Sequence, residues 1–360
     1  MNETSEKIRL KHPNTRQIAQ WLGLLIMLVG SNILSAAAGE RQIIELKDFT
    51  QAEVKNGGFT LPSGGNVHIR ALGAAGEKGN LFSKSNMFAY GWIINADTRE
   101  LVWKMDRNNT KKEADDRRFD DEVSLPAGSY EVYYSAHGYV SGSSFSRFDI
   151  NIDRRKENFD GGNSKRRGFF GWFEEFFGDD LAKEWNRRAK AWGIELSVDE
   201  RWSAVSMFAP PKDFPRVVFK ATKLGENEHI RQQFTLSKPT ALRIYALGEM
   251  DNSDHLADYG WITNAKSRKR MWQMQRADHM SAGGAKKNQK FDEVVEFPAG
   301  EFTLYYITDD SHSYLDWNQP PPDDPLNYGI TLMATNEAGK ANFKLSAGAS
   351  EEKNIVVQLI

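Results

Sequence analysis

The sequence contains no cysteine. Disulfides, thiolate nucleophiles and cysteine-based zinc or iron sites are therefore excluded. Without cross-links, the 360-residue chain must be stabilised by burial of hydrophobic cores. A chain of this length can supply two domains with sizeable cores.

An excess of charge of one sign is also missing, since the formal net charge is -2. The whole chain therefore has no strong electrostatic attraction to DNA, RNA or anionic lipid, and we expect no nucleic-acid partner. The 40% hydrophobic and 12% aromatic residues exclude wholesale disorder.

Sequence motifs of the common enzyme classes are missing too. The seven histidines form no H-E-x-x-H motif and no pair at i, i+4. The chain has no G-x-S-x-G elbow, phosphate-binding loop or dinucleotide-binding turn. A Ser/His/Asp triad assembled from distant segments stays open, because triads are defined by geometry. We expect no catalytic residues, and keep an extracellular hydrolase as the alternative.

The N-terminus has the pattern of an export signal. Basic residues precede an apolar run, Trp21–Val29, and small residues follow at Ser35–Ala38. This order fits an A-x-A cleavage site after Ala38, so we expect residues 1–38 to be a signal peptide. The protein would then be periplasmic, on the outer surface or secreted. The apolar run is short for a spanning helix, and an uncleaved anchor is the minority interpretation.

One motif occurs twice along the chain. YGWI stands at Tyr90–Ile93 and again at Tyr259–Ile262. An FTL block precedes each copy, and W-x-M, PAG and Tyr-Tyr blocks follow in the same order. The spacing is far longer than that of solenoid repeats. We therefore predict two homologous domains, at 42–153 and 216–360, with a linker at 154–215.

Each copy has the periodicity of an antiparallel β-sandwich. Short apolar runs are separated by Gly, Asn, Asp and Pro clusters, which is typical of sandwiches and jelly rolls. The tryptophans and tyrosines repeated in both copies are expected in the cores, and a sugar-stacking platform is the minority interpretation. The predicted strands of the first copy are Gln42–Leu46, Val67–Leu72, Phe88–Asn95, Leu101–Met105, Val123–Leu125, Tyr130–Ser135 and Phe145–Ile152.

The linker contains an aromatic-rich segment. Between 170 and 192, apolar residues recur at helical spacing, acids come early and bases late, as a helix dipole favours. We predict a short helical connector here, continuous or broken near Gly178. Its aromatic face either packs against a sandwich or, through 169–192, makes peripheral contact with a membrane or a partner.

The repeated blocks resemble a known family. The FTL opening, the central D-Y-G-W-I strand and the closing L/F-P-A-G-x-Y/F strand are similar to the bacterial pre-peptidase C-terminal domains. Those are exported, jelly-roll-like modules that accompany secreted enzymes. The resemblance covers about two thirds of each copy. It implies a non-catalytic binding or stabilising role.

The copies differ most after the Tyr-Tyr strand. The second copy continues with adjacent acids, a histidine and a proline-rich stretch, whose stiffness would reduce the entropy lost on binding. Carboxylates and imidazole could hold a divalent cation such as Ca²⁺; capped, solvated turns are the other interpretation. The predicted ligand-binding residues are Asp258, Asp309, Asp310, His312, Asp316 and Trp317.

These expectations combine into one functional hypothesis. The chain would be an exported, non-enzymatic binding or structural module of the cell envelope or secreted space. Its ligand surface would lie in the loops of the second copy, and its partner would be an extracellular polymer or an envelope protein. The first copy would bind nothing at the equivalent place.

Overall fold

The computed structural model describes residues 39–50, 53–75, 87–136, 186–202, 204–250, 255–275 and 280–346. Of these residues, those within 42–198 and 204–346 belong to one compact unit, and residues 39–41 with 199–202 to a second. The predicted signal peptide lies outside the described residues. In the described part of the chain, no helix is long and apolar enough to cross a membrane.

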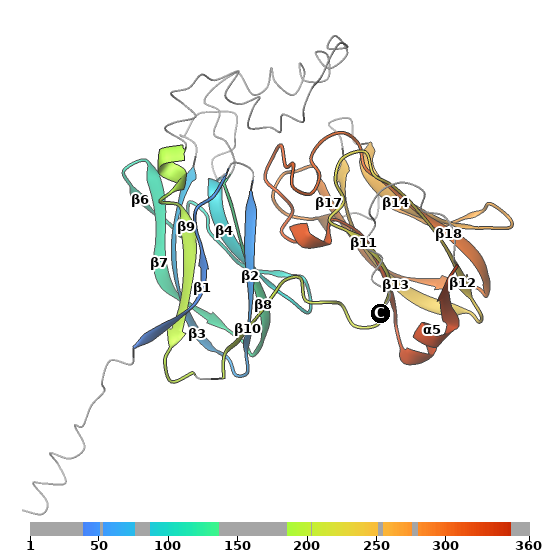
Figure 1. Cartoon of the computed structure of the whole chain (residues 1–360), viewed down its shortest axis with the longest axis horizontal. Coiled ribbons are helices and arrows are strands. Elements are labelled where there is room, and N and C mark those ends of the chain that lie inside the picture. The colour runs from blue at the N-terminus through green and yellow to red at the C-terminus, as the bar shows by residue number, and fades with distance from the viewer. Residues whose placement is uncertain are drawn as a thin grey trace, which may run out of the picture. The chain divides into compact units, whose positions relative to one another are not determined.

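The first sandwich contains ten strands (Figure 1). Six of the seven predicted strands are confirmed, and the seventh, Phe145–Ile152, lies outside the described residues. The strands are β1 (Glu40–Leu46), β2 (Val54–Leu61), β3 (Gly65–Ala75), β4 (Met87–Asn95), β5 (Leu101–Lys104), β6 (Lys111–Glu113), β7 (Asp116–Leu125), β8 (Gly128–Ala136), β9 (Gly193–Asp199) and β10 (Ser206–Phe208).

In the described residues, the second sandwich repeats these ten strands and contains two short helices. The helices are η2 (Pro325–Asn327) and α5 (Glu337–Asn342). The strands are β11 (Val217–Thr222), β12 (His229–Leu236), β13 (Thr240–Met250), β14 (Leu256–Asn264), β15 (Arg270–Gln273), β16 (Met280–Ser281), β17 (Asn288–Phe297), β18 (Gly300–Ile307), β19 (Gly329–Ala334) and β20 (Phe343–Leu345).

The two sandwiches have the same topology. The strand order is β1-β9-β3-β4-β8-β2-β10 in the first and β11-β19-β13-β14-β18-β12-β20 in the second, so each strand corresponds to the one ten numbers later. Neighbouring strands are antiparallel, and β7 and β17 pair with β3 and β13. The duplicated antiparallel β-sandwich is therefore confirmed, over all ten strands of each copy.

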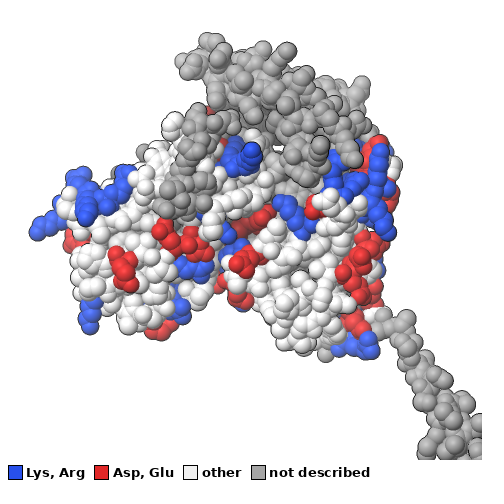
Figure 2. All heavy atoms as spheres, turned by 180° about the vertical axis from the view of Figure 1, so that it is seen from behind, with Lys and Arg blue, Asp and Glu red and all other residues white. Residues whose placement is uncertain are grey.

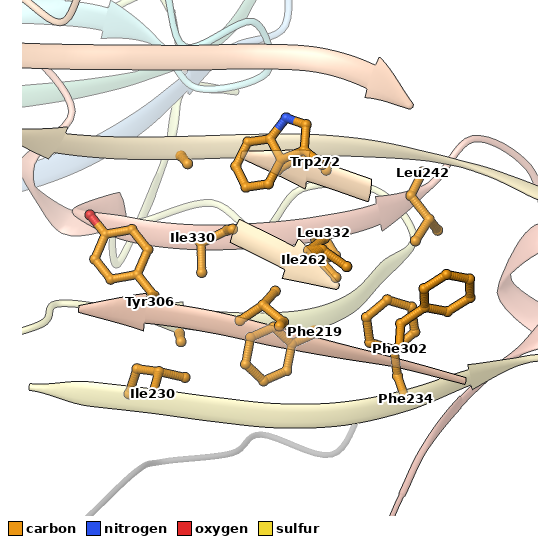
Figure 3. Close-up of a cluster of buried hydrophobic side chains, with 14 of the residues drawn as sticks. Phe219, Ile230, Phe234, Leu242, Ile262, Trp272, Phe302, Tyr306, Ile330 and Leu332 are labelled. Atoms are coloured by element: carbon orange, nitrogen blue, oxygen red, sulfur yellow. The ribbon is translucent and has the colours of Figure 1, made fainter. Parts of the chain in front are cut away.

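Alternation along the strands builds the core of the second sandwich. In β18, Phe302, Leu304 and Tyr306 all point into one cluster, as every second residue of a strand must (Figure 3). Trp272 of β15 closes the same cluster, so its predicted core position is confirmed. Trp261 is different, because it is only half-buried and lies outside that cluster.

The glycine of YGWI is explained by close packing. A Cβ on Gly260 would lie 2.9 Å from the ring of Tyr306 and 3.0 Å from the carbonyl oxygen of Tyr305. A Cβ on Gly91 would lie 2.8 Å from Ile194. Only glycine leaves room for these neighbours, so the motif marks the same close contact in each sandwich.

The predicted linker was wrong in one part. Strands β9 and β10 fall inside 154–215, yet β9 pairs with β3 and β10 with β2 in the first sheet. They correspond to β19 and β20, so they complete the first sandwich and do not connect the two. Most of the predicted aromatic helix lies outside the described residues. At its end, Trp192 is buried and packs edge-on against Phe88 of β4.

Candidate cation site

Two carboxylates face each other where β13 meets β14. Glu249, near the end of β13, is the direct cross-strand partner of Asp258 in β14. The strands approach closely there, since a Cβ on Gly248 would lie 2.1 Å from the Asp258 carbonyl oxygen. Like charges in directly opposed positions destabilise a sheet. The repulsion between the two groups must therefore be relieved by a neighbouring positive charge or by a proton.

A third carboxylate completes the cluster. Asp309 follows β18, and its backbone N–H donates to Asp258 Oδ1 at 2.8 Å. One carboxylate oxygen from each of Glu249, Asp258 and Asp309 lies within 4.8 Å of the other two. Calcium–oxygen distances are about 2.4 Å, so two ligands of one ion are separated by at most ~4.8 Å. The three side chains can thus share one cation.

Glu249 supplies a second sign that the site is built for a ligand. Its Oε1 accepts a hydrogen bond from Lys287 Nζ at 2.8 Å. Its Oε2 is buried and has no hydrogen-bond partner among the described residues. The residue is 5% exposed, and an orphaned buried carboxylate oxygen is costly. A cation beside Asp258 would give that oxygen a partner.

Burial shifts the acidity of both strand carboxyls. Loss of hydration raises the pKa of Glu249 to about 8, although Lys287 opposes the shift. Loss of hydration likewise raises the pKa of Asp258 to about 7; hydrogen bonds donated by the Tyr328 hydroxyl and the Asp309 N–H lower it. A cation would favour the ionised forms of both groups.

The first sandwich lacks the same charges. Ala74 and Ala89 form the corresponding cross-strand pair of β3 and β4, followed by the same register shift. Thus Ala74 stands where Glu249 stands, and Ala89 where Asp258 stands. The position corresponding to Asp309 is residue 137, which lies outside the described residues. The fold alone does not require carboxylates at this junction.

The six residues predicted from the sequence divide into two groups. The structure brings Asp258 and Asp309 together, and it places the other four elsewhere. Asp310 is exposed. Asp316 is half-buried and donates its N–H to the carbonyl of Ser313 in a tight turn.

His312 and Trp317 are buried. The His312 ring lies between the side chains of Asn288 and Asn318, with N···O distances of 2.6 and 3.0 Å. Trp317 meets the rings of His312 and Tyr328 edge-on and belongs to a hydrophobic cluster. Trp317 therefore offers no free face beside a cation.

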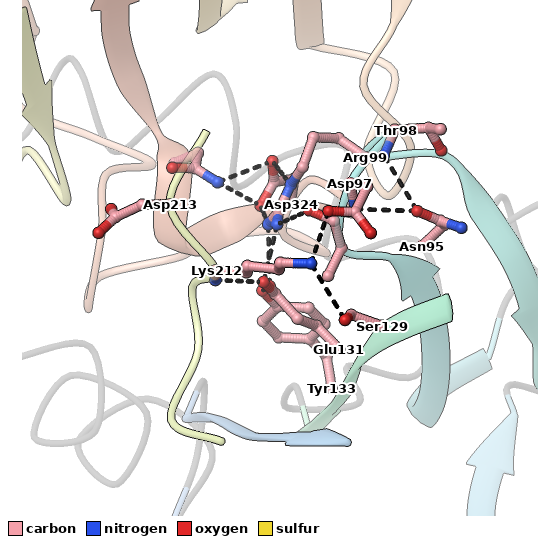
Figure 4. Close-up of polar contacts among 12 residues, drawn as sticks. Asn95, Asp97, Thr98, Arg99, Ser129, Glu131, Tyr133, Lys212, Asp213 and Asp324 are labelled. Atoms are coloured by element: carbon pink, nitrogen blue, oxygen red, sulfur yellow. Dashed lines mark hydrogen bonds and ion pairs between the residues drawn. The ribbon is translucent and has the colours of Figure 1, made fainter. Parts of the chain in front are cut away.

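The proline-rich stretch that follows is held by the first sandwich. Arg99 Nε donates to Asp324 Oδ2 at 2.9 Å, and its Nη1 and Nη2 atoms donate to Glu131 at 2.7 and 2.8 Å (Figure 4). Trp92 Nε1 donates to the Asp323 carbonyl at 2.7 Å, and Lys104 donates to the Asp323 carboxylate at 3.2 Å. The acids of this stretch therefore serve structural contacts.

Two residues that the structure places in important contacts were not singled out from the sequence. Glu249 lies inside a strand that reads as ordinary, and Arg99 lies in a turn. A residue-by-residue comparison of the two copies would have found Glu249. It pairs Gly73-Ala74 with Gly248-Glu249, and Ala89 with Asp258.

Comparison with known proteins adds little to this picture. No family model and no curated protein matches the chain. Among solved structures, the chain is similar to the CUB1-EGF-CUB2 domain of human MASP-1/3, at 8% identity and a TM-score of 0.20. That match covers 82% of this chain and 99% of the other. At this score the likeness carries no argument about function.

Proposed function

We propose that this protein is an exported, non-enzymatic binding module. Its second sandwich binds one divalent cation, such as Ca²⁺, and the loops organised by that cation contact an extracellular polymer or an envelope protein. The observation that carries the proposal is the carboxylate cluster of Glu249, Asp258 and Asp309, two of whose members are alanines in the first sandwich. Export is supported by the order of charged, apolar and small residues at the N-terminus.

The cation is proposed to act by joining segments. Glu249 and Asp258 are fixed by the sheet, whereas Asp309 begins the loop that runs to Asp324. An ion shared by the three would tie the start of the loop to the strands, while Arg99 holds its end. Calcium fits this donor set because it accepts oxygen ligands in flexible geometry.

Calorimetric titration of the full chain with CaCl₂, after removal of metal by chelator, tests the cation site. We expect one ion per chain and loss of binding in Asp258→Asn. Asp310→Asn is the matched control, because it removes the neighbouring exposed charge outside the cluster and should leave binding unchanged. Absence of Ca²⁺ binding, or equal loss in both variants, would overturn the site.

The binding role needs its own experiment. Cosedimentation with insoluble cell-wall polysaccharide, in CaCl₂ or in chelator, should show cation-dependent retention that Asp258→Asn abolishes. The hydrolase alternative is examined with the same samples, by measuring soluble fragments released from the polymer. Release that is abolished by Asp258→Asn or Asp310→Ala, with the fold intact, would replace the binding module with an enzyme.

A further inference from the structure

Each sandwich carries a row of aromatic rings on neighbouring strands, β4 and β8 in the first and β14 and β18 in the second, and each row contains a stacked tryptophan–tyrosine pair. In the second sandwich the row is Tyr259, Trp261 and Tyr305. The Trp261 and Tyr305 rings are stacked, with centroids 5.0 Å apart and planes at 14°. The first sandwich repeats this arrangement with Trp92 and Tyr133, at 5.4 Å and 14°. The duplication has therefore kept the same platform twice.

In the first sandwich the platform is covered by an acidic, proline-containing segment. Residues 320–324, with the sequence PPPDD, contact it through the Trp92 indole N–H and through Lys104 and Arg99. In this sandwich Trp92 is 1% exposed and Tyr133 is fully buried. The chain thus displays on one copy what kind of segment this platform accepts.

Among the residues that the structure describes, no acidic, proline-containing segment makes hydrogen bonds or ion pairs with the platform of the second sandwich. Trp261, Tyr259 and Tyr305 are all only half-buried. Arg268, the counterpart of Arg99, has the same left-handed backbone, with φ of 60° against 61°, yet it is exposed. Thr303 replaces the carboxylate of Glu131, so no acid from that strand position shares the Arg268 charge.

The turn beside the platform has a net negative charge in the first sandwich and a net positive charge in the second. In the first sandwich, residues 95–101 carry one base and two acids, which gives −1. In the second, residues 264–270 read NAKSRKR and carry four bases and no acid, which gives +4. Residues 266–270 are all exposed, and Figure 2 shows a group of Lys and Arg side chains at one edge of the surface in view. The Arg270 guanidinium lies 5.4 Å from the centre of the Trp261 ring.

We infer that this aromatic and basic face binds an extended, acidic, proline-containing segment of a partner protein. Prolines in an extended chain dock on aromatic rings with little loss of entropy. Adjacent carboxylates pair with arginine, which is the chemistry that Arg99 and Asp324 already show in the first sandwich. The inference goes beyond the cation site and is independent of it.

A labelled peptide tests the face directly. The probe is fluorescein-NQPPPDDPL, the sequence of residues 318–326, titrated with the full chain and followed by fluorescence anisotropy at low salt. We expect saturable binding that weakens as salt rises, because the basic turn is exposed. The double variant Arg268→Gln/Arg270→Gln should weaken binding about tenfold, the factor for ~1.4 kcal/mol. Trp261→Ala should do the same, with Trp261→Phe retaining most of the affinity.

The matched control removes the same charge elsewhere. Lys238→Gln/Lys286→Gln takes two exposed bases from other turns of the second sandwich and should leave peptide affinity unchanged. A second peptide with both aspartates replaced by asparagine should bind at least about tenfold more weakly. Equal weakening by the control variant, equal binding of the neutral peptide, or no peptide binding at low salt would overturn the inference. So would an anionic polysaccharide that binds through Arg268 and Arg270 where the peptide does not.

Discussion

Replacing Glu249 by glutamine should stabilise the cation-free protein and abolish its response to Ca²⁺. Glutamine keeps the shape of the side chain and an acceptor for Lys287, and it removes the buried charge opposite Asp258. Its amide N–H group can donate toward the remaining carboxylates. The same substitution also deletes one of three cation ligands. This single substitution should therefore raise the stability of the cation-free protein and remove the stabilisation by Ca²⁺.

The magnitude follows from the pKa of Glu249. Its value in the fold is about 8, against an ordinary value of 4.5. Each pKa unit corresponds to ~1.4 kcal/mol, so ionisation of this group opposes folding by on the order of 5 kcal/mol. The folded chain binds the proton more tightly than the unfolded chain does. Glu249 therefore lowers the stability of the cation-free wild type as pH rises from about 4.5 to about 8, and the variant lacks this contribution while keeping that of Asp258.

Calcium should offset most of this loss of stability in the wild type. An ion present at a thousandfold excess over its Kd adds about 4 kcal/mol to the folded state. At pH 8 the calcium-loaded wild type should therefore approach the stability of Glu249→Gln in chelator. At pH 5, where the carboxyl is protonated in the cation-free fold, the two proteins should differ little without Ca²⁺.

Thermal unfolding at pH 5 and pH 8, each in chelator and in CaCl₂, measures the stability of both proteins under all four conditions. Asp310→Asn is the control, and its transition should follow the wild type in every condition. If Glu249→Gln has a lower Tm than the wild type at pH 8 in chelator, the claim that the buried Glu249 charge destabilises the fold is wrong. If Ca²⁺ raises the Tm of the wild type and of Glu249→Gln equally, the claim that Glu249 is a cation ligand is wrong.

Three other predictions concern the fold. Arg99→Met leaves two buried carboxylates without their shared cation and should lose ~3–5 kcal/mol of unfolding free energy in urea denaturation; Arg268→Met, at the exposed equivalent, should stay within about 0.5 kcal/mol. Trp317→Ala should lose ~3–5 kcal/mol of unfolding free energy because a core ring is removed. Trp317→Phe should keep its Ca²⁺ affinity in calorimetry. A selective loss of Ca²⁺ affinity in Trp317→Phe would show that Trp317 belongs to the cation site. Gly91→Ala and Gly260→Ala should each lose ~1–3 kcal/mol in thermal unfolding, because the added methyl meets a packed ring or side chain.

The fold could be predicted because the duplication repeats the residues at structurally constrained positions. The YGWI, W-x-M and PAG blocks mark a close contact, a core ring and a turn, and such positions tolerate little change. Strands β9 and β10 were missed for a different reason. They lie far along the chain from β3 and β2, and only that non-local pairing distinguishes them from a linker.

The candidate site could be predicted only in part. Asp258 and Asp309 stood out because loop composition and the strand entry are visible in the sequence. Glu249 did not, because its role depends on the register that places it opposite Asp258. His312 and Trp317 have residue types that suit a ligand site, yet both are buried in packing. Burial of a proline-rich loop depends on partners from distant segments, which local pattern does not reveal.

Both unusual features of the second sandwich oppose stability. Glu249 and Asp258 are buried carboxylates where the first sandwich has alanines, and the 264–270 turn concentrates four like charges beside half-buried rings. The first sandwich shows that the same fold needs neither feature. A protein retains locally unfavourable residues mainly where they serve function. We therefore propose that the two copies have different roles: the first holds the 320–324 segment, and the second carries the charged sites proposed to bind ligands. If that division is right, neutralising each feature separately should raise stability while removing a different binding activity.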